Sequence, residues 1–253
     1  MTTLLPGETL AASLADQITV TQQKMRAAQA AGDTIRAECI IRTINLPLKS
    51  AELRRAIFEL VRWVPYRLGS WNGEAMSLFQ QESGDCRHKA AAAAELLQYA
   101  GETARKTLVR FNWADLPVPG KILSILPDTQ GFHNTVEFSL NGEMHLMDAT
   151  WDIALRSANF PVMPVWDGMS DTWRVTLGNP SALQQVVMPA EGQDIYAANQ
   201  MSWPQRDKTM AFNQALNDWM DEVRRNRDDR CITIHTNRES TKFSLRECLG
   251  QLA

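Results

Sequence analysis

The sequence is poor in cysteine and histidine, with four of each in 253 residues. No two cysteines form a CxxC pair, which argues against a zinc knuckle, an iron–sulfur cluster or a thioredoxin-type redox site. So few cysteines also cannot make a disulfide scaffold, and we expect free, mostly buried thiols in a reducing compartment. The cysteines are Cys39, Cys86, Cys231 and Cys248, and the histidines are His88, His133, His145 and His235.

Other features are missing as well. Lys and Arg number 26 against 29 Asp and Glu, so the basic excess expected of a nucleic-acid binder is absent. No run of about 18 apolar residues occurs, which predicts no membrane partner. The N-terminus lacks the basic and apolar regions of a signal peptide, which predicts a cytoplasmic protein. The motifs HExxH, GxxxxGKS/T, GxGxxG and GxSxG are absent, and with them the common metalloprotease, nucleotide-binding and α/β-hydrolase signatures.

The chain does contain enough apolar sequence, 44% of its residues, for a sizeable core. Its pattern divides it into three parts. Residues 1–50 form an N-terminal helical segment, in which Ala, Gln and charged residues dominate. Residues 51–155 form a central core. Residues 156–253 form a C-terminal extension that either completes the sheet of the core or makes a small subdomain.

Two helices are predicted in the central core. The first covers residues 51–63, where apolar residues share one face, and it ends before Pro65. The second covers residues 85–101 and contains five consecutive alanines, the residue with the highest helix propensity. Asp85 is a good N-cap for this second helix, and Gly101 stands where a C′ glycine is preferred.

Strands are predicted after these helices, which makes the fold α+β. Residues 107–111 have the composition of a strand, 113–131 contain three prolines and are expected to form a loop, and 132–151 predict a β-hairpin around Asn141-Gly142. The predicted elements of the C-terminal extension are a strand at 174–177, an amphipathic helix at 207–226, a strand at 231–235 and a short helix from Ser244. The predicted core face of the amphipathic helix consists of Met210, Leu216, Trp219, Met220 and Val223.

Cys86 has the strongest features of a nucleophile. As the first residue of the helix that Asp85 caps, it lies beside unpaired backbone N–H groups and the positive end of the helix dipole. Arg87 and Lys89 add positive charge, and each of these effects favours the reactive thiolate. On this segment alone, a buried structural cysteine at a helix start is an equal alternative. The other three cysteines lie in apolar stretches or near the C-terminus and have no comparable surroundings.

Two of the four histidines are poor partners for Cys86. His88 is two residues further along the same helix, and side chains at i and i+2 point apart. His235 lies in a separate segment with no acidic residue at a telling spacing. The general base is therefore expected in the hairpin.

The hairpin separates its two histidines by strand alternation. A two-residue turn puts His133 and Asp148 on one face as diagonal neighbours, within reach of an aspartate–imidazole hydrogen bond. The same alternation puts His145 on the other face with Phe138 and Val136, where we expect a packed histidine without a carboxylate. The alternative is a solvated polar face on which His133 and Asp148 are adjacent by chance.

A nucleophile, a base and a carboxylate that orients the base make up a triad for acyl transfer, and Cys86, His133 and Asp148 supply them. These residues lie in the segments GDCRHKAAAAAELLQYAGETARKTLVRF, HNTVEF and NGEMHLMDATW. The ordered set resembles the transglutaminase-like superfamily of cysteine enzymes over about residues 55–152. It departs from that pattern at Ala149, where a proline is usual, and at Asn134-Thr135, where Ala-Trp is common.

The resemblance implies a papain-like arrangement, in which the nucleophile helix packs on an antiparallel sheet that carries the base and the acid. It also implies an oxyanion hole formed by the backbone N–H of Cys86 and one upstream side chain. The candidates for that side chain are Tyr66, Trp63, Gln80 and Gln81. Tyr66 resembles a tyrosine often found upstream of the nucleophile in the family, and we take it as the first candidate.

The resemblance further implies acyl transfer on an amide of a protein or peptide substrate, without a cofactor or a metal. Water as the acceptor gives a peptidase or a deamidase, and an amine gives a transglutaminase. We expect a peptidase or amidohydrolase, by analogy with single-module members of the superfamily. No EF-hand loop is present to support calcium activation.

Two other functions stay open at this point. The fold can serve as a non-catalytic protein-binding module, for which the eight tryptophans would supply a surface, although tryptophans are more often core residues. An arylamine-type acyltransferase uses the same triad with a coenzyme A thioester. Arg87, Lys89 and Arg105 could bind that coenzyme, although basic residues on a helix more often form a solvated face.

Overall fold

The protein is described by a computed structural model. It describes residues 50–69, 77–176, 186–190, 192–228, 232–235 and 240–243. The predicted N-terminal helical segment before Ser50, the predicted helix from Ser244 and the cysteines Cys39, Cys231 and Cys248 lie outside the described residues.

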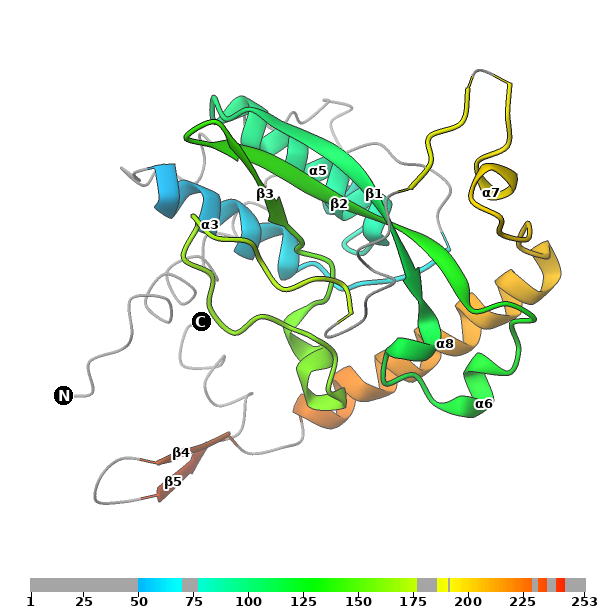
Figure 1. The fold of residues 1–253 in the computed structure, drawn as a ribbon. Helices are drawn as coiled ribbons and strands as arrows, with labels where there is room; N and C mark the ends of the chain where they lie inside the picture. Colours follow the sequence, from blue (N-terminus) through cyan, green and yellow to red (C-terminus); the bar gives the residue numbers. More distant parts are fainter. Residues whose placement is uncertain are drawn as a thin grey trace, which may run out of the picture.

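The chain folds into helices and a small antiparallel sheet, so the fold is mixed α+β (Figure 1). The helices are α3 (Ser50–Arg62), α4 (Ser77–Gln80), α5 (Cys86–Tyr99), α6 (Gly120–Leu123), α7 (Ile195–Ala198) and α8 (Arg206–Asp228), with 3-10 helices η1 (Trp113–Asp115) and η2 (Ile153–Ala158). The strands are β1 (Ala104–Asn112), β2 (Gln130–Leu140), β3 (Glu143–Met147), β4 (Ile232–His235) and β5 (Ser240–Phe243). The first three strands form one sheet in the order β1-β2-β3, and the last two form a separate two-stranded sheet.

The ends of α5 confirm the capping predicted from the sequence. The side chain of Asp85 accepts a hydrogen bond from the backbone N–H of Arg87 at 3.0 Å. At the other end, Gly101 has φ +85°, and the N–H of Glu102 donates to the carbonyl of Leu97 at 3.0 Å. This is the Schellman motif, for which glycine is preferred because it adopts a positive φ without strain. The cap at the first end fixes Cys86 as the first residue of the helix.

The hairpin has the predicted register, with Leu140 opposite Glu143 and Phe138 opposite His145. The prediction of a loop over 113–131 was wrong in part, because this stretch contains η1, α6 and the first residues of β2. The predicted strand at 174–177 was also wrong: residues 174–176 belong to no strand, and residue 177 lies outside the described residues.

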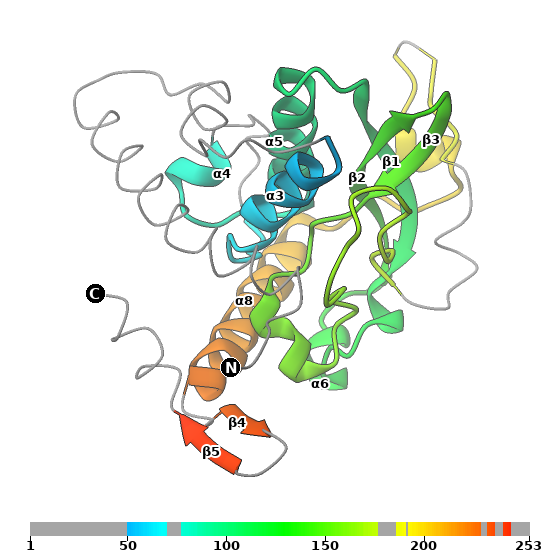
Figure 2. The same ribbon diagram turned by 90° about the vertical axis from the view of Figure 1, so that its left-hand side faces the viewer.

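Two hydrophobic clusters hold the elements together. In the first, α3 and α5 pack on one side of the three-stranded sheet (Figure 2). Its members include Ile57, Phe58, Leu60, Leu96, Leu97, Val136, Phe138 and Trp166. The second cluster joins β1 and the segment around η2 to α8. Its members include Tyr66, Phe111, Trp113, Trp151, Phe160, Phe212, Leu216 and Met220.

Helix α8 covers the predicted amphipathic helix, but part of its predicted core face was wrong. Leu216 and Met220 are buried as expected, whereas Met210 is 58% exposed and Phe212 is buried instead. At about 100° per residue, Met210 lies about 200° around the helix from Phe212 and so on the outer side. The ring of Phe212 packs edge-on against that of Trp113, with the centroids 5.2 Å apart. The second cluster therefore packs on the face of α8 that carries Phe212, Leu216 and Met220.

Candidate functional site

Cys86 is partly exposed and begins α5 immediately after a tight contact between two chain segments. In this contact, the N–H of Arg67 donates to the carbonyl of Gly84 at 3.0 Å, and the N–H of Gly84 donates to the carbonyl of Pro65 at 3.1 Å. A Cβ on Gly84 would lie 2.8 Å from the Cβ of His88, so only glycine fits there. The segment around Tyr66 is thus held beside the start of α5.

His133 is buried on β2, with 2% of its surface exposed. Its Nε2 lies 2.8 Å from Oδ2 of Asp148, and both side chains are at most 4% exposed. The hydroxyl of Thr150 lies 3.4 Å from the same nitrogen. Since Nε2 is taken by Asp148, Nδ1 is the nitrogen left to exchange a proton with the sulfur of Cys86.

The pKa of His133 is raised by its neighbours. Burial alone would lower this pKa, but the charge and hydrogen bond of Asp148 raise it, as do a hydrogen bond to Cys86 and its charge, and the pKa reaches about 10. His133 is therefore an imidazolium at neutral pH.

The backbone around Asp148 fixes its carboxylate. The N–H of Thr150 donates to Oδ1 at 3.1 Å, which leaves Oδ2 for His133. The N–H of Asp148 itself donates to the hydroxyl of Thr172 at 2.7 Å. Neither threonine was predicted from the sequence. Thr150 could have been found, because Asp commonly accepts from the N–H two residues further on, whereas the spacing to Thr172 carries no local signal.

The other histidines have separate partners. His88 is fully buried, and its Nδ1 lies 3.0 Å from Oδ1 of Asp85, so it does not serve Cys86. His145 packs against Phe138 as predicted, with ring centroids 5.6 Å apart. The expectation that it lacks a carboxylate was wrong, because its Nδ1 lies 3.2 Å from Asp171. That aspartate comes from a distant loop, which strand alternation could not reveal. The side chain of His235 lies outside the described residues.

Among the four candidates for the oxyanion hole, Tyr66 shares a cavity wall with Cys86. Its ring packs against Trp151 with the centroids 4.7 Å apart. Burial and the charge of Cys86 raise the pKa of Tyr66 well above its usual value, so its hydroxyl keeps the proton that an oxyanion donor needs. Trp63 and Gln81 are exposed and do not line this cavity, and the side chain of Gln80 lies outside the described residues.

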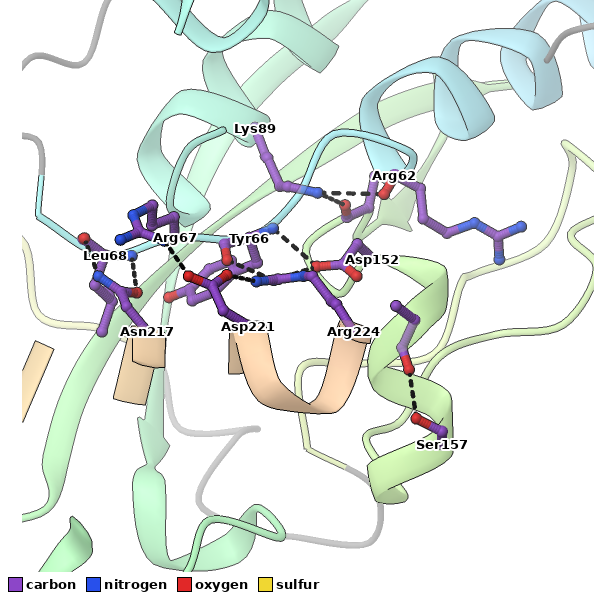
Figure 3. Close-up of polar contacts among 12 residues, drawn as sticks. Arg62, Tyr66, Arg67, Leu68, Lys89, Asp152, Ser157, Asn217, Asp221 and Arg224 are labelled. Atoms are coloured by element: carbon purple, nitrogen blue, oxygen red, sulfur yellow. Dashed lines mark hydrogen bonds and ion pairs between the residues drawn. The ribbon is translucent and has the colours of Figure 1, made fainter. Parts of the chain in front are cut away.

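Lys89 lies beneath the site and is 1% exposed, so its predicted place on a solvated face, or in a slot for coenzyme A, was wrong. Its Nζ donates to the carbonyl of Arg62 at 3.4 Å (Figure 3). It also donates to the carbonyls of Val61 at 3.1 Å and Ala149 at 3.4 Å. Burial lowers the pKa of Lys89 to about 7. The side chain ties the end of α3 to the residue that follows Asp148.

Helix α8 holds the Tyr66 segment through three polar side chains, which we call the α8 seam: Asn217, Asp221 and Arg224 (Figure 3). The amide of Asn217 pairs with both backbone groups of Leu68, at 2.9 Å and 2.7 Å. Arg224 donates to the carbonyl of Tyr66 at 2.7 Å and to Asp152, also at 2.7 Å. The residues recur every three or four positions, so they share one face of the helix.

Asp152 also bonds to the Tyr66 segment and to Arg224 of the α8 seam. Its Oδ2 accepts from the N–H of Tyr66 at 2.9 Å and from Arg224 at 2.7 Å. Its side chain is 6% exposed, and a carboxylate so deeply buried needs such partners. Tyr66 is thus held through both its N–H and its carbonyl.

Cys86 lines a cavity of about 460 Å³. The wall also carries aromatic rings and several amide side chains. Its described residues include Tyr66, Leu68, Arg87, Phe111, Trp113, Leu126, Asp128, Gln130, Phe132, Asn134, Tyr196, Trp203, Gln205, Phe212 and Asn213. Most of one wall comes from α7, the start of α8 and the residues between them.

Within the described residues, no group of three or more His, Cys, Asp or Glu side chains is arranged to hold a metal ion. In the same part of the chain, no helix combines the length and apolar character needed to cross a membrane. The chain matches no protein-family model and no curated protein.

Proposed function

We propose that the protein is a cysteine-dependent amide hydrolase that acts on protein or peptide substrates through Cys86, His133 and Asp148, on a papain-like core of the transglutaminase type. The observation that carries the proposal is the buried 2.8 Å contact between His133 Nε2 and Asp148, together with the place of Cys86 at a helix N-terminus. A chance pairing on a solvated face would not be buried in this way.

In the first half of the reaction, the thiolate of Cys86 attacks the amide carbonyl and forms a C–S bond. The oxyanion that develops is bound by the backbone N–H of Cys86 and the hydroxyl of Tyr66. The imidazolium of His133 gives its Nδ1 proton to the amide nitrogen, the C–N bond breaks, and the amine leaves. The product is a thioester on Cys86 and a neutral imidazole.

In the second half, the neutral imidazole of His133 takes a proton from water, and the hydroxide oxygen attacks the thioester. The C–S bond breaks, which releases the acid and restores the ion pair of thiolate and imidazolium. Asp148 holds the ring in one orientation and stabilises the imidazolium throughout the cycle. An amine in place of water would give transamidation at the same centre.

The first test is the rate at which iodoacetamide alkylates Cys86 across pH, with the modified residue identified by mass spectrometry. We expect Cys86 to react well below pH 8 and the His133→Ala variant to react at least about tenfold more slowly, because the neighbouring positive charge is lost. His145→Ala is the matched control, since it removes a histidine–aspartate pair outside the cavity wall. If Cys86 reacts no faster than the other cysteines, the proposal fails.

The second test identifies the reaction. A peptide mixture from a digested cell lysate is incubated with wild type or with Cys86→Ala in the presence of a biotin-labelled primary amine. New chain ends that need Cys86 mean peptide hydrolysis, and this is the result we expect. Conversion of glutamine to glutamate would mean deamidation, and incorporation of the amine would mean transamidation.

A further inference from the structure

We propose that Phe132, Tyr196 and Trp203 form a subsite that binds an aromatic or large apolar side chain of the substrate, next to the amide that Cys86 attacks. The inference rests on the proposed function. Its starting point is that these three rings and Cys86 line the same cavity.

The three rings pack in a row. The ring centroids of Phe132 and Tyr196 are 5.1 Å apart, and those of Tyr196 and Trp203 are 4.6 Å apart. The indole N–H of Trp203 donates to Asp194, which also accepts from the backbone N–H of Tyr196 at 2.8 Å. Although it is held in this way, Trp203 is 65% exposed. A fixed and exposed indole offers its face to another ring at little cost in side-chain entropy.

The row begins near the nucleophile. Tyr196 lines the cavity together with Arg87, the residue that follows Cys86. Phe132 is the neighbour of His133 along β2. Because Cys86 and the three rings line one cavity, a substrate whose carbonyl reaches Cys86 has room to place an adjacent side chain against them.

The charges of the cavity disfavour an anionic occupant. Its described charged residues are Asp85, Arg87 and Asp128, of which Asp85 and Arg87 form an ion pair at 2.5 Å. A coenzyme A phosphate would need a surplus of positive charge, and these residues supply none. The cavity volume of about 460 Å³ lies within the range of small-ligand sites. Amide side chains in the wall, Asn134, Gln205 and Asn213, can bond the substrate backbone.

The first measurement uses iodoacetamides that carry an N-phenethyl, N-carboxyethyl or N-aminoethyl group. Alkylation rates of Cys86 are divided by the rates with free cysteine, which removes differences in intrinsic reactivity. We expect the phenethyl probe to react about tenfold faster than the two charged probes. We expect this preference to fall about three- to tenfold in Trp203→Ala, the range that follows from losing one aromatic contact. Trp173→Ala removes an exposed tryptophan outside the cavity wall and is the matched control.

The second measurement needs no reaction at residue 86. Binding of N-acetyl-para-fluorophenylalaninamide to the Cys86→Ala protein is followed by fluorine NMR, alone and with Trp203→Ala added. Weaker binding in the double variant supports the subsite even if the proposed chemistry fails in the alkylation test. Equal rates for the three probes, or binding that does not depend on Trp203, overturns the subsite and leaves the proposed function standing.

Discussion

Lys89 offers the sharpest test of the electrostatics beneath the site. The perturbation is Lys89→Met, which keeps the volume of the buried stem and removes the ammonium that three backbone carbonyls accept from. Burial lowers the pKa of this group from 10.5 to about 7 in the folded protein. The unfolded chain therefore binds more protons at Lys89 between these two pH values. The stability that it contributes is full above the unfolded pKa and is lost as pH falls through about 7.

His133 has the opposite dependence. Its folded pKa of about 10 lies above the ordinary value of 6.5, so its contribution is full below pH 6.5 and is lost as pH rises through about 10. Each group contributes a slope of about 1.4 kcal/mol per pH unit where only one state is protonated. Between pH 7 and 10 the two slopes oppose each other in the wild type. Removing Lys89 leaves the slope of His133 uncompensated.

The assay is urea unfolding of wild type and Lys89→Met at intervals from pH 7 to 10. We expect the stability of the variant, relative to wild type, to fall by about 1 kcal/mol per pH unit across this window. Lys106→Met, on the exposed side of β1, is the control and should show a difference that does not change with pH. A pH-independent difference for Lys89→Met would mean that the buried amine keeps its ordinary pKa, and would refute the reasoning.

Three further predictions concern the triad and its support. On the proposed function, Asp148→Asn should lower kcat by at least about 100-fold with little change in KM, because the imidazolium loses its charged partner. The measurement is steady-state kinetics on a peptide whose cleavage needs Cys86, and an unchanged kcat would exclude Asp148 from the proposed triad. Arg224→Met leaves the buried carboxylate of Asp152 without its ion pair and should lower the free energy of unfolding in urea by about 3 kcal/mol. The exposed Arg225→Met should lower it by under about 0.5 kcal/mol. Equal losses in the two variants would mean that the α8 seam does not stabilise the fold. Gly84→Ala should cost about 1–3 kcal/mol by thermal unfolding, because its Cβ has no room, while Gly120→Ala, which meets nothing, should be neutral.

The sequence predicted the parts of the site that depend on local rules. Helix capping by Asp85 follows from residue preference, and the face shared by His133 and Asp148 follows from strand alternation about a two-residue turn. Both rules act over a few residues. For the same reason, the register of the hairpin was predicted correctly over the paired strands, from Val136 opposite Met147 to Leu140 opposite Glu143.

The parts that the sequence did not predict depend on partners far apart in the chain. Lys89 bonds to Ala149, 60 residues away, and Arg224 bonds to Tyr66, 158 residues away. No periodicity links such pairs, and a lysine on an alanine-rich helix has the pattern of a surface residue. His145 shows the same limit, because its partner Asp171 comes from an irregular segment.

The α8 seam has a consequence for synthesis of the chain. Tyr66 and Leu68 precede α8 by about 150 residues, yet their backbone groups are bonded by Asn217 and Arg224. A ribosome that adds residues at about 5–20 per second needs about 10 seconds or more to extend the chain over that distance. Until then the Tyr66 segment beside Cys86 lacks its hydrogen bonds to α8. On the proposed function, the nascent chain therefore carries Cys86 without a finished site until α8 has emerged and docked.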